Sequence, residues 1–222
     1  MDFEQSLRLS IALGLTIFLV LLRFDSERIM RSDYFRYRYP WMGPLSYYGL
    51  VIGFAIGIVI ILPNGRGELF LAPGDPDKAL PILLAFSAVA ILNAVAFAFR
   101  WYGGITPLPT PLLPTRLLGA AASAVADELQ FRSIVLGMLI FAELPGGVTT
   151  AVVLQALLYG LAQRRLWRER LWYFLIGSVI LGYALGWIVI ETGSVVPAMV
   201  AHFAVIAALF AFAGGRLRAR PI

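Results

Sequence analysis

The sequence contains no cysteine and a single histidine, His202, among its 222 residues. Without cysteine the chain can form neither a disulfide nor a thiolate metal site, and it has no cysteine nucleophile. A single histidine excludes any metal centre that needs two histidine ligands from one chain. We therefore expect no bound metal ion and no cofactor.

Charged residues are also scarce, at 14% of the chain, whereas hydrophobic residues make up 60%. This composition is typical of an integral membrane protein and not of a soluble domain. The first apolar run, residues 7–22, follows acidic residues and has no small-residue cleavage site after it. We therefore expect no cleavable signal peptide.

Apolar runs long enough to cross a bilayer as helices recur along the chain. They predict an all-α polytopic transmembrane helix bundle of about seven spans, which forms a single domain over residues 1–222. The expected spans are residues 7–22, 47–62, 79–99, 116–142, 148–163, 171–190 and 195–213. The first span is short, and we expect Arg23 at its end to snorkel to the membrane interface.

Small residues recur every four positions in two of these spans. The second span carries Gly49, Gly53 and Gly57, and the sixth carries Ser178, Gly182 and Gly186. Small residues at this spacing let another helix backbone approach closely. The pattern therefore predicts that each of these faces packs against a neighbouring helix.

Most of the 18 lysine and arginine residues lie in connections that would share one side of the membrane. The positive-inside rule then places the N-terminus outside and the C-terminus in the cytoplasm, with a bacterial inner membrane as the expected location. Residues 24–46 mix arginine with tyrosine and tryptophan, which is typical of a cytoplasmic or interfacial segment at anionic headgroups. The positive charge therefore indicates membrane lipids, and not nucleic acid, as its partner.

Three ionisable side chains interrupt the apolar fourth span: Asp127, Glu128 and Arg132. A charge at the centre of a bilayer costs at least about 2.5–3.5 kcal/mol on insertion scales. On a helix Glu128 and Arg132 share a face, and Asp127 points about 100° away from Glu128. The three residues form either a structural ion-pair network or a functional site. We expect His202 of the seventh span to face them, as a catalytic imidazole or as an interhelix hydrogen-bond partner.

Two later stretches place this cluster in a recognisable order. Tyr159 and Gln163 lie four residues apart in the fifth span, and residues 192–202 read Thr-Gly-Ser-Val-Val-Pro-Ala-Met-Val-Ala-His. Together with residues 127–132 they resemble the CPBP family of intramembrane proteases, which contains the CAAX-processing endopeptidases and the Abi proteins. That family shows Glu-Glu-x-x-x-Arg, then Phe-x-x-x-His, then His-x-x-x-Asn or Asp after a Thr-Gly-Ser-x-x-Pro turn. The resemblance covers residues 117–210 and implies a CAAX-protease-like core.

The resemblance also implies a set of site residues. In the family a glutamate of the first motif activates a water, while the histidines and the Asn or Asp position that water and stabilise the oxyanion. At the corresponding positions this sequence has Asp127 and Glu128 for the two glutamates, Arg132 unchanged, Tyr159 for the Phe, Gln163 for the first His, His202 unchanged and Ile206 for the Asn or Asp. A purely structural interpretation makes Tyr159 a packing residue and Gln163 an interfacial one.

These departures weaken the catalytic set that the resemblance implies. Aspartate withdraws the carboxylate by one methylene, and a displacement near 1 Å can cost on the order of 100-fold in rate. Gln163 cannot exchange a proton at neutral pH and Ile206 offers no polar group, whereas one oxyanion donor is worth roughly 100- to 1,000-fold. The sequence therefore indicates a CPBP homologue with impaired catalysis, which binds a membrane protein partner or serves as a subunit of a membrane complex.

Two other functions are compatible with the same residues. The first is an active intramembrane endopeptidase that uses Asp127 or Glu128 with His202 to cleave prenylated or hydrophobic peptides. The second is a subunit in which His202 ligates a pigment or a haem. A water-accessible cavity that joins the carboxylates to His202 would favour the peptidase, and a packed interior would favour the binding protein.

Overall fold

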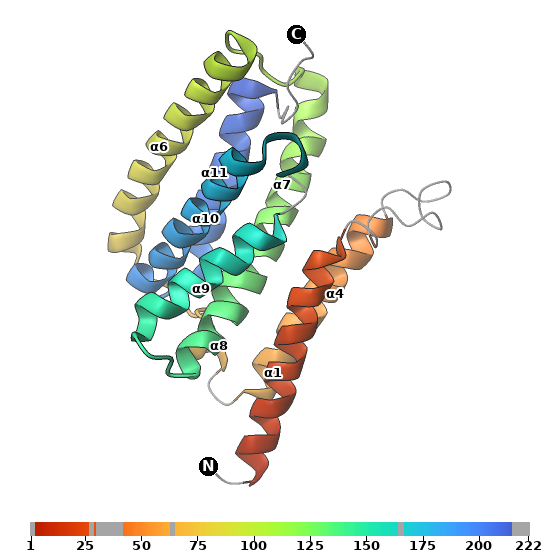
Figure 1. Cartoon of the computed structure of the whole chain (residues 1–222), viewed down its shortest axis with the longest axis vertical. Coiled ribbons are helices and arrows are strands. Elements are labelled where there is room, and N and C mark those ends of the chain that lie inside the picture. Colours follow the sequence, from red (N-terminus) through yellow and green to blue (C-terminus); the bar gives the residue numbers. More distant parts are fainter. Residues whose placement is uncertain (1–2, 27–28, 30–41, 63–64, 164–166, 215–222) are drawn as a thin grey trace.

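The computed structural model describes residues 3–26, 29, 42–62, 65–163 and 167–214, and all regular structure in these ranges is helical (Figure 1). The elements are α1 (Phe3–Phe24), α4 (Met42–Ile61), α5 (Gly65–Glu68), α6 (Pro76–Tyr102), the 3₁₀ turn η1 (Thr110–Leu112), α7 (Leu113–Glu128), the π-helix η2 (Leu129–Val135), α8 (Leu136–Phe141), α9 (Gly147–Ala162), α10 (Trp167–Thr192) and α11 (Val195–Ala213). The all-α fold class is therefore confirmed. Most of the basic and aromatic segment expected at residues 24–46 lies outside the described residues.

Five helices are long and apolar enough to cross a membrane, namely α1, α4, α6, the Leu175–Thr192 part of α10, and α11. The chain is therefore a polytopic integral membrane protein. The other two expected spans correspond to the α7–η2–α8 path and to α9. The first carries the buried charges, and the second, at 1.5 Å per residue, is only about 24 Å long. Each has one exposed face and one buried face, and the buried faces hold the polar side chains Arg132 and Gln155, around which protein replaces lipid.

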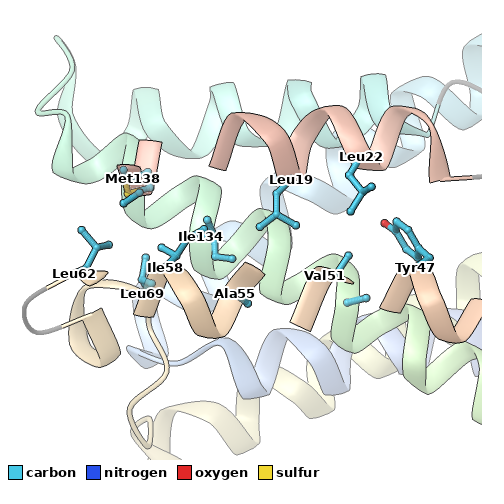
Figure 2. Packing of buried hydrophobic residues seen from close by; sticks show 12 residues of the cluster. Leu19, Leu22, Tyr47, Val51, Ala55, Ile58, Leu62, Leu69, Ile134 and Met138 are labelled. Atoms are coloured by element: carbon cyan, nitrogen blue, oxygen red, sulfur yellow. The ribbon is translucent and has the colours of Figure 1, made fainter. Parts of the chain in front are cut away.

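The helices form a bundle with a pair of helices beside it. In Figure 1, α6, α7, α9, α10 and α11 lie together, and α1 and α4 run along one side. The pair meets the bundle mainly through α7 and η2. Figure 2 shows Leu19 of α1 and Ile58 of α4 near Ile134 of η2, and Leu22 and Val51 belong to the same apolar cluster farther along the pair. The apolar contact therefore fixes α1 against the segment that follows Glu128.

Turn chemistry sets the ends of α6 and α11, which pack against each other. The Asp75 side chain caps the N-terminus of α6, and the Ser194 side chain accepts a hydrogen bond from the Val196 backbone N–H at the start of α11. Gly103 and Gly214 end these helices with φ of 72° and 63°, a left-handed conformation that glycine adopts without steric cost. The Ser194 cap fixes where α11 begins and hence the height of His202.

The connection between α4 and α6 folds back into the bundle. The Ser133 hydroxyl donates to the Leu69 carbonyl, and the Val195 backbone N–H donates to the Phe70 carbonyl over 2.9 Å. A Cβ on Gly137 would lie only 2.7 Å from the Glu68 carbonyl oxygen, so the connection occupies the space that glycine leaves. The start of α11 is thereby joined to η2 and α8.

The small-residue faces behave differently in the two helices that carry them. A Cβ on Gly182 of α10 would lie 3.1 Å from the Ala156 Cα, and one on Gly186 would lie 3.1 Å from the Val152 side chain. Close packing of this face is confirmed, because α9 lies directly against it. On α4, a Cβ on Gly49 or Gly53 would meet no atom of the described residues within 4 Å. The predicted close approach at α4 is therefore not made within this part of the chain.

Candidate functional site

The charged stretch lies where the helix of the expected fourth span changes its winding. Asp127 and Glu128 are the last residues of α7, and the π-helix η2 begins at Leu129. The expectation of one uninterrupted α-helix over residues 116–142 is therefore wrong at its centre. π-Helical turns are rare and occur frequently at functional sites. The wider turn changes which side chains lie above one another, so the four-residue spacing of Glu128 and Arg132 does not by itself describe their geometry.

Glu128 occupies the centre of a buried ionic cluster. Its Oε1 lies 2.7 Å from Nδ1 of His202 on α11 and 3.2 Å from Nη1 of Arg132 on η2. The Glu128 and Arg132 side chains are fully buried, and His202 is 5% exposed. The contact with Arg132 is ionic without hydrogen-bond alignment, and Oε2 of Glu128 makes no hydrogen bond to a described residue. The structure thus brings Glu128, Arg132 and His202 together, and His202 faces the fourth span as the sequence predicted.

Tyr159 of α9 completes this cluster from the opposite side of His202. Its hydroxyl lies 3.4 Å from Nε2 of His202, and the Cζ of Arg132 lies 3.9 Å from the centre of its ring. Phe131 meets the same ring edge-on, with the ring centres 5.3 Å apart. A cation over an aromatic face is stabilised by the ring quadrupole, the more so where water is excluded. Tyr159 therefore does more than fill space, because it contacts both the imidazole and the guanidinium.

Asp127 belongs to a second cluster. Its Oδ2 accepts a hydrogen bond from Arg23 Nη2 over 3.1 Å and another from Gln163 Nε2 over 3.3 Å. The Arg23 side chain is only 12% exposed, so it does not snorkel to the interface as expected. It turns inward because Asp127 offers a buried anionic partner. Three elements, α1, α7 and the end of α9, meet at this carboxylate.

Sequence reasoning missed the part that α1 plays. The Gln130 side-chain amide donates to the Leu19 carbonyl, and Val20 packs against the cluster that Phe131 and Tyr159 form. With Arg23, these contacts lay the second half of α1 over the site. The sequence offers only a weak signal for this contact. Arg23 lies at the end of one apolar span, and Asp127 lies in another span without an obvious partner of opposite charge.

The remaining motif position holds no polar group. Ile206 lies one turn after His202 on α11 and is half-buried. Among the described residues, no group of three or more His, Asp and Glu side chains is arranged to hold a metal ion. Both nitrogens of His202 face protein groups, Glu128 and Tyr159, so neither is directed at a site for a haem or a pigment.

Comparison with known proteins identifies the family of this region. Residues 109–208 match the family described as type II CAAX prenyl endopeptidase Rce1-like. No curated protein and no solved structure matches the chain. The matched range contains Asp127, Glu128, Arg132, Tyr159 and His202, whereas Arg23 lies outside it. Residues 109–208 are therefore a domain of the Rce1-like type II CAAX prenyl endopeptidase (CPBP) family.

Proposed function

We propose that this protein is a CPBP-family member that does not cleave peptides and acts by binding a membrane protein partner. The observation that carries the proposal is the buried contact of Arg23 with Asp127, over 3.1 Å. Asp127 stands at the first glutamate of the family pattern. In this chain the carboxylate is already paired, and the pairing residue comes from outside the matched domain.

The pairing opposes catalysis by Asp127 for two reasons. The Arg23 guanidinium donates to the Asp127 oxygen Oδ2, which a catalytic water would otherwise contact. The same oxygen, Oδ2, also accepts from Gln163, which stands where the family has a histidine. An amide can hold the carboxylate in place, but it cannot take a proton from a water. The residue at the water-activating position, Asp127, therefore binds Gln163, which stands at a water-positioning position, and also binds Arg23.

Access to the site supports the same function. Asp127, Glu128, Arg132, Tyr159 and His202 are each at least 95% buried. α1 lies over them on one side through Leu19, Val20 and Arg23. A peptide could reach Glu128 only if α1 or another helix moved away. The packed site is suited to holding α1 and the bundle together.

The binding role would use the outer surface of the bundle. α1, α4 and α6 expose large apolar side chains, such as Ile17, Ile56 and Leu92, as helices in contact with lipid do. The protein partner is a hydrophobic transmembrane segment, since a protein that packs on these faces must itself lie within the bilayer. Stoichiometric recovery of one membrane protein with the chain, after purification in mild detergent, is the expected result.

A cleavage assay tests the loss of activity directly. The purified protein, reconstituted in lipid nanodiscs, is incubated with prenylated and with hydrophobic peptides, and the products are followed by mass spectrometry. We expect the wild-type protein to release no more product than Glu128→Gln. Reproducible turnover that Glu128→Gln abolishes would contradict the proposal. An exposed variant, Glu143→Gln, controls for a general effect of removing one acidic group.

One observation favours the alternative function, an active intramembrane endopeptidase. Glu128 and His202 are 2.7 Å apart, as a general base and its orienting partner need to be. Glu128 Oε2 makes no hydrogen bond to a described residue and is therefore able to accept one from a water. In that case Glu128→Gln and His202→Ala would each abolish turnover, while Asp127→Asn would not.

Orientation is proposed on the distribution of charge. The N-terminus lies outside and the end of α11 lies in the cytoplasm of a bacterial-type inner membrane, because most arginines flank helix ends on the side where α1 ends and α11 ends. The Asp127 cluster, with Arg23 near the end of α1 and Gln163 at the end of α9, then lies toward the cytoplasmic face.

A further inference from the structure

His202 has a protein group at each of its two nitrogens. Nδ1 lies 2.7 Å from Glu128 Oε1, and Nε2 lies 3.4 Å from the Tyr159 hydroxyl. The imidazole and the phenol rings stand perpendicular, with their centres 6.1 Å apart. The three side chains come from three different elements, α7, α9 and α11, so their alignment is a property of the tertiary fold.

Charge balance in this cluster favours a neutral imidazole. Glu128 carries one negative charge, and Arg132 supplies the positive charge that balances it. The neighbouring Asp127 is balanced separately by Arg23. A protonated His202 would add a second cation to a site from which water is excluded, and an unbalanced buried charge is costly.

The partners of a neutral imidazole determine where its one proton lies. A carboxylate oxygen only accepts hydrogen bonds, so the nitrogen 2.7 Å from Glu128 Oε1 is the one that carries the proton. Nε2 then has a lone pair, and its partner must be a donor. The Tyr159 hydroxyl is the group in contact with Nε2, and it can donate.

We propose that Tyr159 is a positioning residue that donates its phenolic proton to His202 Nε2 and so holds the imidazole as the neutral, Nδ1-protonated tautomer. The chain of hydrogen bonds runs from Tyr159 O–H to Nε2, and from Nδ1–H to Glu128. A Phe at position 159, as in the family pattern, could not make the first of these bonds. The hydroxyl caps the nitrogen that a substrate or an attacking water would otherwise reach.

The surroundings of Tyr159 hold its hydroxyl in this position. Arg132 covers one face of the ring, Phe131 meets the ring edge-on, and α10 approaches closely at Gly182. A Cβ on Gly182 would lie 3.2 Å from Tyr159 Cδ1, so the ring rests against the helix where the side chain is missing. Rotation of the phenol away from His202 would require one of these neighbours to move.

The tautomer of His202 does not depend on the proposed non-cleaving function. Only its consequence does: with both nitrogens in contact with protein groups, His202 has no nitrogen free to contact a substrate.

Because His202 is the only histidine in the chain, selective ¹⁵N-histidine labelling yields the signals of this one ring. The protein in nanodiscs should give one protonated-type resonance, assigned to Nδ1, and one unprotonated-type resonance, assigned to Nε2. Two protonated-type resonances, or a proton on Nε2, would overturn the proposal.

The variant experiment identifies Tyr159 as the donor. In Tyr159→Phe, the Nε2 resonance should move downfield by several parts per million, because an unprotonated nitrogen loses an accepted hydrogen bond, while Nδ1 keeps its proton. Tyr183→Phe, the same change on an exposed part of α10, should leave both resonances in place. An unchanged Nε2 resonance in Tyr159→Phe would contradict the role given to the hydroxyl. These readouts do not depend on cleavage, so their failure would leave the proposed function standing.

Discussion

Arg23 and Asp127 are 104 positions apart in the chain, yet the guanidinium of one donates to the carboxylate of the other over 3.1 Å. The pair joins α1, which precedes the matched residues 109–208, to the position that resembles the first glutamate of the family pattern. The two adjacent acids therefore have different partners, because Glu128 contacts His202 and Arg132 instead. The residues that resemble one catalytic set therefore divide into two clusters. Asp127 lies in one, and Glu128, Arg132 and His202 form the other.

The Arg23–Asp127 pair should contribute strongly to stability. We expect Arg23→Met and Asp127→Asn each to lower the free energy of unfolding by about 3–5 kcal/mol, because each leaves a buried charge without its partner. The double variant should lose less than the sum of the two. Unfolding in mixed micelles measures all three.

The exposed pair of Arg8 and Glu4 provides a matched control on the same helix. Arg8→Met should change stability by less than about 1 kcal/mol, since solvent weakens a surface ion pair. Losses of that small size for Arg23→Met, or strict additivity in the double variant, would show that the buried contact does not join α1 to the bundle.

Gly137 should be intolerant of a side chain. The added methyl group of Gly137→Ala would meet the Glu68 carbonyl oxygen at 2.7 Å and the Leu69 side chain at 2.9 Å. The α4–α6 connection would have to move, which should lower the free energy of unfolding by about 1–3 kcal/mol, the usual range for overpacking. Thermal unfolding in detergent reports this as a lower melting temperature. Gly119→Ala, in an open helical position of α7, should be neutral or stabilising by up to about 1 kcal/mol.

Restoring the family pattern should restore cleavage only if Arg23 is also changed. A variant with Asp127→Glu, Gln163→His and Ile206→Asn should remain inactive, because the carboxylate at position 127 keeps its guanidinium partner. Adding Arg23→Gln should raise product formation at least about 100-fold above the wild-type background, because the freed carboxylate can then act with the restored donors, one of which is worth about 100-fold or more. Product formation from a prenylated peptide measures both.

The restored variant has its own control in Glu128→Gln, which should return turnover to the wild-type level. Circular dichroism and size-exclusion chromatography establish that each protein is folded. Equal cleavage by the wild-type and restored proteins would mean that the altered positions are not what limits activity, and the peptidase function would then be preferred.

The absence of cysteine makes orientation directly measurable. Glu143→Cys lies in the exposed turn between α8 and α9, and Thr110→Cys lies in the exposed η1 turn between α6 and α7. An impermeant thiol reagent applied to intact cells should label Glu143→Cys fully and Thr110→Cys only after the membrane is opened. The reverse pattern would contradict the proposed orientation, and labelling of both from outside would contradict the alternation of the helices.

Much of the fold could be predicted from apolar runs and helix-ending residues. The runs that became α1, α4, α6 and α11 were each identified, because burial in lipid selects apolar side chains one residue at a time. The meeting of Glu128 with His202 was also predictable, since two polar groups inside a membrane protein usually find each other. Small residues located the packed face of α10, but the same pattern on α4 has no partner among the described residues.

The composition and order of residues by themselves determined that this chain is a helical membrane protein with acids and one imidazole inside it. Only the tertiary structure decided which acid each base would meet. An arginine at a helix end can be solvated by water or can pair with a buried carboxylate. Which of the two occurs depends on the distance to the carboxylate, and that distance cannot be predicted from the sequence. The packing of α1 on η2 brings Asp127 within reach, and at that distance the charge interaction decides the position of Arg23.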